Sequence, residues 1–215
     1  MEAGNPLLDR YVLDLTGRKR PKVCFLPSAS GDADHYIVRF YRHFGSDCCR
    51  PSHVSLFRRE RGVRNLRAHL LSQDLIYVGG GCVVSLLGVW RAHGLDVMLR
   101  EAWDRGVILC GLSAGSLCWF AEAVSAYNGP ARVVRGLGFL PHSNTVHYDS
   151  EPTRRELYHR RVEEGMVAGY ASEDGAALHF VDDTLARVVS SRPGARPSRK
   201  SETCVGSHWR SPKAA

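Results

Sequence analysis

The chain has 215 residues, of which 44% are hydrophobic and 24% are charged, and it carries a formal net charge of +7. A chain of this length and composition can bury one sizeable core, so we expect a single domain. No stretch approaches the roughly 20 apolar residues of a membrane-spanning helix, and the N-terminus lacks the basic-then-apolar pattern of a signal peptide. The expected location is therefore the cytoplasm, and a membrane is not an expected partner.

The cysteines argue against a metal centre. There are seven of them, several lie in apolar runs, and none forms a Cys-x-x-Cys pair or a cluster with histidines. Cysteines in such runs behave as small buried hydrophobic residues, whereas zinc sites need closely spaced ligands. We therefore expect neither a metal site nor a cofactor.

The basic charge is concentrated at the C-terminus. Residues 191–215 contain six basic side chains and one acidic side chain, which leaves about +2 for the rest of the chain. This segment also holds three prolines and has no apolar periodicity, which is typical of a flexible or loosely docked tail. We therefore predict one domain at residues 1–190 and a tail at 191–215. A solvated tail is favoured over an arm that binds nucleic acid or another polyanion.

Short apolar runs alternate with amphipathic segments along most of the chain, which is typical of a parallel sheet flanked by helices. The predicted elements are, in chain order, strand 22–27, helix 36–44, strand 53–57, helix 65–72, strand 74–78, helices 84–93 and 95–105, strand 107–110, an irregular strand 133–141, helix 151–167, and strands 168–171, 176–180 and 186–190. The last three are expected to form a mixed or antiparallel portion. The predicted fold class is α/β, with a mostly parallel sheet between layers of helices.

A nucleophile-elbow pattern follows the strand predicted at 107–110. The pentapeptide Gly111-Leu112-Ser113-Ala114-Gly115 lies directly behind this strand and directly ahead of a helix-like stretch. A sharp strand-to-helix turn of this kind lifts a serine hydroxyl clear of the sheet, and the flanking glycines leave room for the close approach of the backbone. We therefore predict that Ser113 is a nucleophile.

A serine nucleophile needs a base within hydrogen-bond reach and normally a third group that orients the base. Among the ten histidines, His147 is the first candidate, because it lies in a predicted loop between a strand-like run and a helix. It also follows the serine along the chain, as in other α/β enzymes with an elbow. His142, five residues earlier in the same loop, is the second candidate.

Several motifs in the same order give the chain a specific resemblance to a known family. They are Phe25-Leu26-Pro27-Ser28-Ala29-Ser30, Tyr77-Val78-Gly79-Gly80-Gly81, Trp90-Arg91-Ala92-His93-Gly94-Leu95-Asp96, Gly111-Leu112-Ser113-Ala114-Gly115-Ser116 with Trp119-Phe120, His147-Tyr148-Asp149-Ser150-Glu151-Pro152, and Asp174-Gly175-Ala176-Ala177-Leu178. Together they resemble the S51 peptidases, the group of peptidase E (aspartyl dipeptidase) and cyanophycinase. The resemblance covers residues 7–193 and implies a fold related to the class I glutamine amidotransferases, with serine in place of cysteine.

The resemblance also implies an activity and a site. The expected reaction is the hydrolysis of dipeptides or short peptides that begin with aspartate, without a cofactor. Carried over by motif, Ser113 is the nucleophile and His147 is the base. Backbone N–H groups of Ala114 and of the glycine turn, at Gly80 or Gly81, would hold the oxyanion, and such donors commonly contribute about 10²–10³ in rate.

Three positions depart from the pattern of the family. Cys82 follows the glycines where the family usually has asparagine, and Val146 precedes the histidine where proline is usual. Ala126 stands near the place where the compact bacterial branch commonly has an aspartate. These departures motivate an alternative hypothesis, in which the chain is a non-catalytic or regulatory scaffold that binds a small acidic ligand. A further alternative is another small serine hydrolase, an esterase or an amidase.

The third catalytic residue and the substrate-binding residues are the least determined. Glu122 is the first choice for the carboxylate that orients the histidine, because it is the one acidic residue present where the family commonly has acids after the elbow. Glu151 and Asp149 are the next choices. Binding an acidic substrate should need a cation, because a buried carboxylate without one is costly. Arg154 and Arg155, just after the His147 loop, are the candidates by position, as is Arg132. The expected partner is a small acidic peptide, and a homodimer is left open.

Overall fold

The computed structural model describes residues 1–2, 4–57, 63–127, 129–193 and 197–200, the last four by their backbone alone. The helices are α1 (Leu7–Asp14), the 3-10 turn η1 (Ser28–Ser30), α2 (Asp34–His43), α3 (Leu66–Leu71), α4 (Val83–His93), α5 (Leu95–Asp104), α6 (Ala114–Leu117) and α7 (Pro152–Glu163). The strands are β1 (Lys22–Leu26), β2 (Arg50–His53), β3 (Leu75–Val78), β4 (Ile108–Gly111), β5 (Phe120–Ser125), β6 (Arg132–Arg135), β7 (Leu140–Val146), β8 (Gly169–Ser172), β9 (Ala176–Val181), β10 (Thr184–Ser190) and β11 (Pro197–Lys200). Their arrangement confirms the predicted α/β class.

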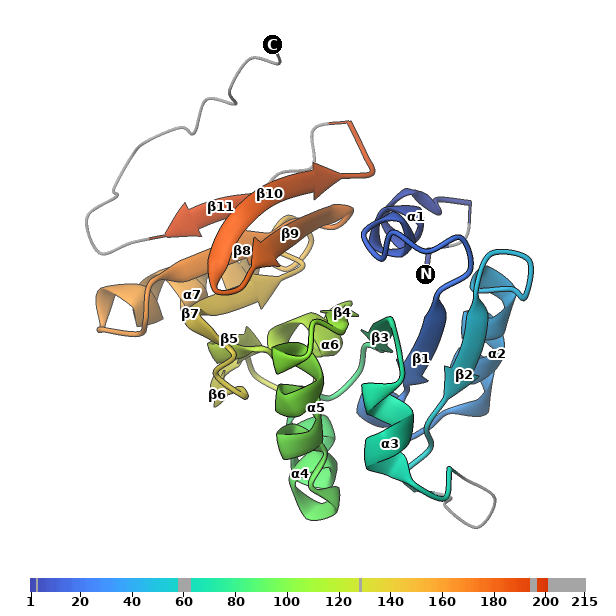
Figure 1. Ribbon diagram of the computed structural model, residues 1–215. Coiled ribbons are helices and arrows are strands. Elements are labelled where there is room, and N and C mark those ends of the chain that lie inside the picture. The colour runs from blue at the N-terminus through green and yellow to red at the C-terminus, as the bar shows by residue number, and fades with distance from the viewer. Residues whose placement is uncertain (3, 58–62, 128, 194–196, 201–215) are drawn as a thin grey trace.

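The strands form two main sheets, which lie side by side with α6 at their junction (Figure 1). The first is fully parallel and has the order β2-β1-β3-β4. The second has the order β11-β8-β7-β5-β6, in which β5, β7 and β8 are parallel and the two outer strands are antiparallel. Strands β9 and β10 form a separate antiparallel hairpin. The three C-terminal strands predicted as a mixed portion are thus β8, β9 and β10.

The parallel sheet is covered on both faces, and its two central strands, β1 and β3, are apolar and buried at every position except Lys22. On β1, Val23 and Phe25 pack with the apolar side chains of α1 and α2. Cys24 and Leu26 point the other way and pack with α3, α4 and α5. Since alternate residues of a strand face opposite sides, a continuous apolar run is what a sheet between two helical layers requires.

The strand predicted at 53–57 ends earlier than the sequence suggests, because β2 covers only Arg50–His53. The reason is the buried Asp32, whose carboxylate accepts hydrogen bonds from the N–H groups of Leu56 and Phe57 at 2.6 and 2.9 Å. These donors are therefore not available to a strand ladder. The prediction of a strand over 53–57 was wrong for this reason.

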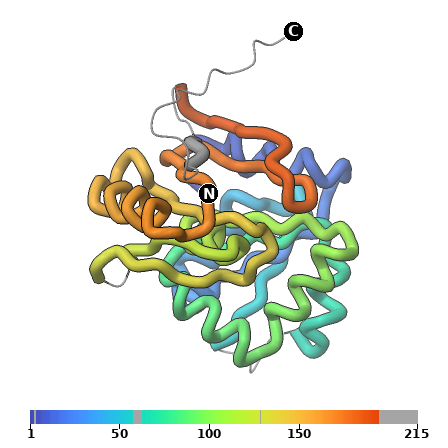
Figure 2. Tube along the Cα trace, turned by 90° about the vertical axis from the view of Figure 1, so that its left-hand side faces the viewer, coloured from blue at the N-terminus to red at the C-terminus, as the bar shows by residue number. Residues whose placement is uncertain are grey.

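The predicted boundary between domain and tail at residue 191 also shifts. Ser191 donates its N–H to the carbonyl of Gly175, and its side chain accepts a hydrogen bond from Asn5. Residues 197–200 form β11, which pairs with β8. The N-terminal segment and the end of β10 therefore lie against each other. Helix α1 lies beside β9 (Figure 2), and Tyr11 of the helix is hydrogen-bonded to His179 of the strand. The rest of the predicted tail, 201–215, is outside the described residues.

The described helices include none that is both long enough and apolar enough to span a bilayer.

Candidate active site

Ser113 lies at a sharp turn between β4 and α6, as the elbow pattern predicts. Its backbone has φ +52° and ψ −118°, a conformation that side-chain-bearing residues rarely adopt and that stores strain. The two flanking glycines are required by packing. A methyl group on Gly115 would overlap the carbonyl oxygen of Val78, and one on Gly111 would overlap the backbone of Gly115.

We expect Gly115→Ala to destabilise the fold by about 1–3 kcal/mol or more, because the added methyl group would overlap the backbone of Val78 and Gly79, which cannot move without disturbing β3. Gly88→Ala is the matched control. Gly88 lies inside α4 with open space where its methyl group would go, so alanine should raise stability by up to about 1 kcal/mol. Urea denaturation of both variants measures the two free energies, and equal midpoints would contradict the packing argument.

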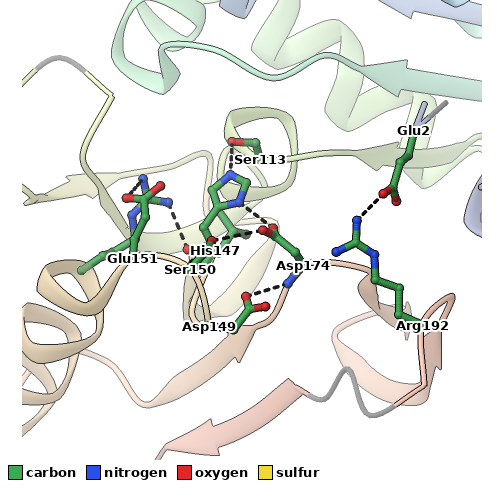
Figure 3. A network of polar contacts seen from close by, with 10 residues as sticks. Glu2, Ser113, His147, Asp149, Ser150, Glu151, Asp174 and Arg192 are labelled. Carbon is green, nitrogen blue, oxygen red and sulfur yellow. Dashed lines mark hydrogen bonds and ion pairs between the residues drawn. The ribbon is translucent and has the colours of Figure 1, made fainter.

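His147 lies directly after β7 and contacts the serine. Its Nε2 is 3.1 Å from the Ser113 hydroxyl, and its Nδ1 is 2.6 Å from a carboxylate oxygen of Asp174 (Figure 3). A carboxylate can only accept at Nδ1, so the ring carries its proton there and Nε2 is left to accept from the serine hydroxyl. The three side chains therefore form one chain of hydrogen bonds, in the order and tautomer that a serine nucleophile and its base require.

The loop after His147 also holds Asp174 in place. The hydroxyl of Ser150 donates to the second carboxylate oxygen of Asp174 at 3.1 Å. The backbone N–H of Asp174 donates to the side chain of Asp149 at 2.9 Å (Figure 3). Both oxygens of Asp174 thus have partners, and the carboxylate is fixed from two sides.

Glu122 does not orient the histidine, so the prediction for the third residue is corrected. Glu122 lies on β5, and its carboxylate accepts from the N–H of Val167 at 3.0 Å. Glu151 forms an ion pair with Arg154 at 2.9 Å, and Asp149 contacts the backbone of Asp174 rather than the ring of His147.

The second candidate for the base is also placed elsewhere. The ring of His142 lies within β7 and packs against Tyr170 and Phe180, whereas His147 is the histidine that contacts Ser113.

Sequence reasoning missed Asp174 because the residue is 27 positions from His147. Strands β7 and β8 are parallel neighbours, so the segments that follow them meet at the same edge of the sheet. His147 follows β7, and Asp174 lies just after β8. A signal existed, since Asp174 begins a motif of the family resemblance and lies between the strands predicted at 168–171 and 176–180. The sequence alone did not tell which strands are adjacent.

The glycine turn at residues 79–81 lies beside Ser113. A methyl group on Gly80 would come within 3.3 Å of Cβ of Ser113, and one on Gly81, whose φ is +139°, would overlap the carbonyl of Ala29. The N–H of Gly80 donates to the hydroxyl of Tyr36 at 2.9 Å. Within the described part of the chain, no protein group accepts from the N–H of Gly81 or of Ala114.

The two arginines predicted to bind substrate have other partners in this structure. Arg154 is buried and donates to the carbonyl of Val146 at 3.0 Å, besides its ion pair with Glu151. Burial lowers the pKa of its guanidinium, and the charge of Glu151 opposes this shift. Arg155 donates twice to the carbonyl of Tyr148, at 3.0 and 2.8 Å, and lies over the ring of that residue. Both side chains thus hold the loop that carries the histidine.

The third cation considered, Arg132, lies exposed on β6.

We expect Arg154→Ala to lower kcat about 10- to 100-fold for acidic and neutral substrates alike, because the histidine loop loses its anchor. The melting temperature should fall as well, since a buried carbonyl loses its donor. Arg161→Ala is the control, because Arg161 lies on the same helix and its ion pair with the C-cap residue Glu164 is about half exposed and contributes little. A selective rise in KM for acidic substrates would instead assign Arg154 to substrate binding.

None of the six cysteines that the structure describes takes part in the hydrogen-bond chain of the site. Burial raises the pKa of the Cys24 thiol to about 12 and raises those of Cys110 and Cys118 as well. Cys82, at the position where the family usually has asparagine, caps α4, and its sulfur accepts from the N–H of Ser85 at 3.5 Å. The cysteine thus supplies an N-terminal cap, which is also what an asparagine side chain provides. Among the described residues, no three His, Cys, Asp or Glu side chains form a group that could hold a metal ion.

Comparisons with known proteins place this geometry in a family. The model of peptidase family S51 matches residues 1–188. The chain is 47% identical over 200 residues to the uncharacterized peptidase YgaJ of Bacillus subtilis (strain 168). This alignment covers 93% of this chain and 86% of YgaJ.

Two solved structures share the fold. A protein designated peptidase E from Listeria monocytogenes EGD-e aligns with a TM-score of 0.60 and 19% identity, over 89% of this chain and 93% of that one. A peptidase from an acI-B1 actinobacterium also has a TM-score of 0.60, with 15% identity, over 86% of this chain and 91% of that one. The match of the family model over nearly the whole domain, together with the 47% identity to YgaJ, shows that the chain belongs to peptidase family S51.

Proposed function

We propose that this chain is a serine peptidase of the peptidase E type, which hydrolyses dipeptides or short peptides with an N-terminal aspartate. The observation that carries the proposal is the continuous hydrogen-bond chain from Asp174 through His147 to the Ser113 hydroxyl. The proposal includes a cytoplasmic location, a small acidic peptide as the partner and a reaction without a cofactor.

In the proposed reaction, the Ser113 oxygen attacks the carbonyl carbon of the scissile peptide bond while Nε2 of His147 accepts the hydroxyl proton. Asp174 keeps the ring oriented and stabilises the imidazolium that forms. The negative charge on the former carbonyl oxygen is held by N–H donors of the glycine turn and of Ala114. His147 then returns the proton to the leaving amine, and the acyl-enzyme is hydrolysed by a water molecule that the same histidine activates.

The preference for aspartate rests on the family and not on a cation in the structure, because Arg154 and Arg155 bind backbone carbonyls. The test must therefore measure separately how the hydrolysis rate depends on the charge of the substrate side chain and on the type of bond that is cleaved. Aspartyl and asparaginyl p-nitroanilides form the decisive pair, since their side chains have the same shape and differ in charge. Leucyl p-nitroanilide and a p-nitrophenyl ester complete the panel.

We expect the purified protein to hydrolyse the aspartyl compound about 10- to 100-fold faster than the asparaginyl one, the range that a charged hydrogen bond supplies. A fluorophosphonate should label the protein, with the adduct mapped to Ser113. Cleavage of the ester without any anilide would point to an esterase. A folded protein that resists the fluorophosphonate and cleaves nothing would point to a binding scaffold.

A further inference from the structure

Tyr36 connects the helix α2 to the glycine turn beside the nucleophile. Its ring packs against the turn, since a methyl group on Gly79 would lie 3.1 Å from Cε1 of Tyr36. Its hydroxyl accepts the N–H of Gly80 at 2.9 Å. The ring also packs edge-on against Phe25, with centroids 5.4 Å apart. The sequence places Tyr36 in an apolar stripe with Phe40 and Phe44. In the structure Phe40 and Phe44 are fully buried, whereas Tyr36 is only partly buried.

This contact changes the set of donors available to an oxyanion. The sequence predicts that Gly80 or Gly81 supplies one of the N–H groups, yet the N–H of Gly80 is already used by Tyr36. A phenol that accepts one hydrogen bond still has its own hydrogen to donate. Among the described residues, no protein group accepts from the Tyr36 hydroxyl.

The hydroxyl also stays protonated under ordinary conditions. Burial raises the pKa of Tyr36, and the hydrogen bond from Gly80 only partly offsets this effect. The hydroxyl is therefore a donor throughout the neutral range. It is also close to the chemistry, since the residue that binds it, Gly80, lies directly against Ser113.

We propose that the Tyr36 hydroxyl is an oxyanion donor: it receives the N–H of Gly80 and donates its own O–H to the substrate carbonyl oxygen. Gly80 then acts through Tyr36, and the N–H groups of Gly81 and Ala114 act directly. A phenol that accepts a hydrogen bond is polarised and becomes a better donor. This inference rests on the proposed function, because it names a further catalytic residue for the same reaction.

The test is Tyr36→Phe, which keeps the ring packed on the turn and removes only the hydroxyl. We expect kcat for the aspartyl p-nitroanilide to fall about 10²–10³-fold with KM unchanged, the loss typical of one oxyanion donor. The affinity for a peptide boronic acid, whose adduct with serine carries the tetrahedral oxyanion, should fall by a similar factor. Tyr41→Phe is the matched control. It removes a hydroxyl from the same helix, where that group contacts His53 at 2.8 Å, and should leave kcat unchanged.

Two results would overturn the inference. If kcat stays constant or rises, the N–H of Gly80 is the true donor and Tyr36 merely covers it. If kcat falls but the boronic acid binds as tightly as to the wild type, the Tyr36 hydroxyl does not donate to the oxyanion and only holds the glycine turn in position.

The rate of fluorophosphonate labelling at Ser113 separates this inference from the proposed function. It depends on the same oxyanion donors but needs no peptide substrate. A protein that is labelled but cleaves no peptide refutes the peptidase proposal, and slower labelling of Tyr36→Phe would then still support Tyr36. A protein that is not labelled at all refutes both.

Discussion

Replacing Ser113 by alanine is expected to reduce kcat for the aspartyl p-nitroanilide about 10⁶-fold, because the nucleophile is lost and the base has nothing to activate. The remaining rate comes from the oxyanion donors and from substrate binding. Steady-state kinetics at saturating substrate measures the loss. A variant that keeps more than about one hundredth of the wild-type rate would show that Ser113 is not the nucleophile.

The backbone at Ser113 makes a second variant informative. Alanine keeps the strain of the φ of +52°, whereas glycine adopts such a conformation without steric cost. Ser113→Gly should therefore be as inactive as Ser113→Ala and yet more stable, by about 1–3 kcal/mol. Urea denaturation of the two inactive variants gives this difference directly. Equal stabilities would mean that the turn at Ser113 is not strained.

Asp174→Asn is expected to lower kcat about 10⁴-fold, the size of effect known for this change in a serine protease triad. An amide at this position can donate to Nδ1 of His147, which favours the tautomer with the proton on Nε2. That tautomer cannot accept the proton of Ser113. The overall fold should persist, because asparagine has the same shape as aspartate.

Glu122→Gln is the matched control for Asp174→Asn, because it makes the same change from a carboxylate to an amide. The amide oxygen of glutamine can still accept from the N–H of Val167, so kcat should stay within a few-fold of the wild type. The two variants, measured side by side, distinguish the carboxylate that contacts His147 from the one that lies nearer the elbow in sequence. A large loss for Glu122→Gln and none for Asp174→Asn would reverse the assignment.

The sequence by itself determined the features that depend on local patterns. The apolar run before Gly111 and the glycines around Ser113 predict a strand, a tight turn and a short helix, because each follows from neighbouring residues. The position of His147 after a strand was accessible in the same way. The α/β class followed from the alternation of apolar runs and amphipathic segments, and the structure confirms it.

Only the tertiary structure decided which distant groups meet. The order β8-β7-β5 brings Asp174 to His147 and leaves Glu122 with Val167. The same packing directs Arg154 to a backbone carbonyl and turns the hydroxyl of Tyr36 toward Gly80. Strand order depends on pairing between segments far apart in the chain, and local periodicity carries no information about it. The sequence was therefore enough to propose Ser113 and His147, which the structure brings into contact, whereas the carboxylate that completes the hydrogen-bond chain had to be seen in the fold.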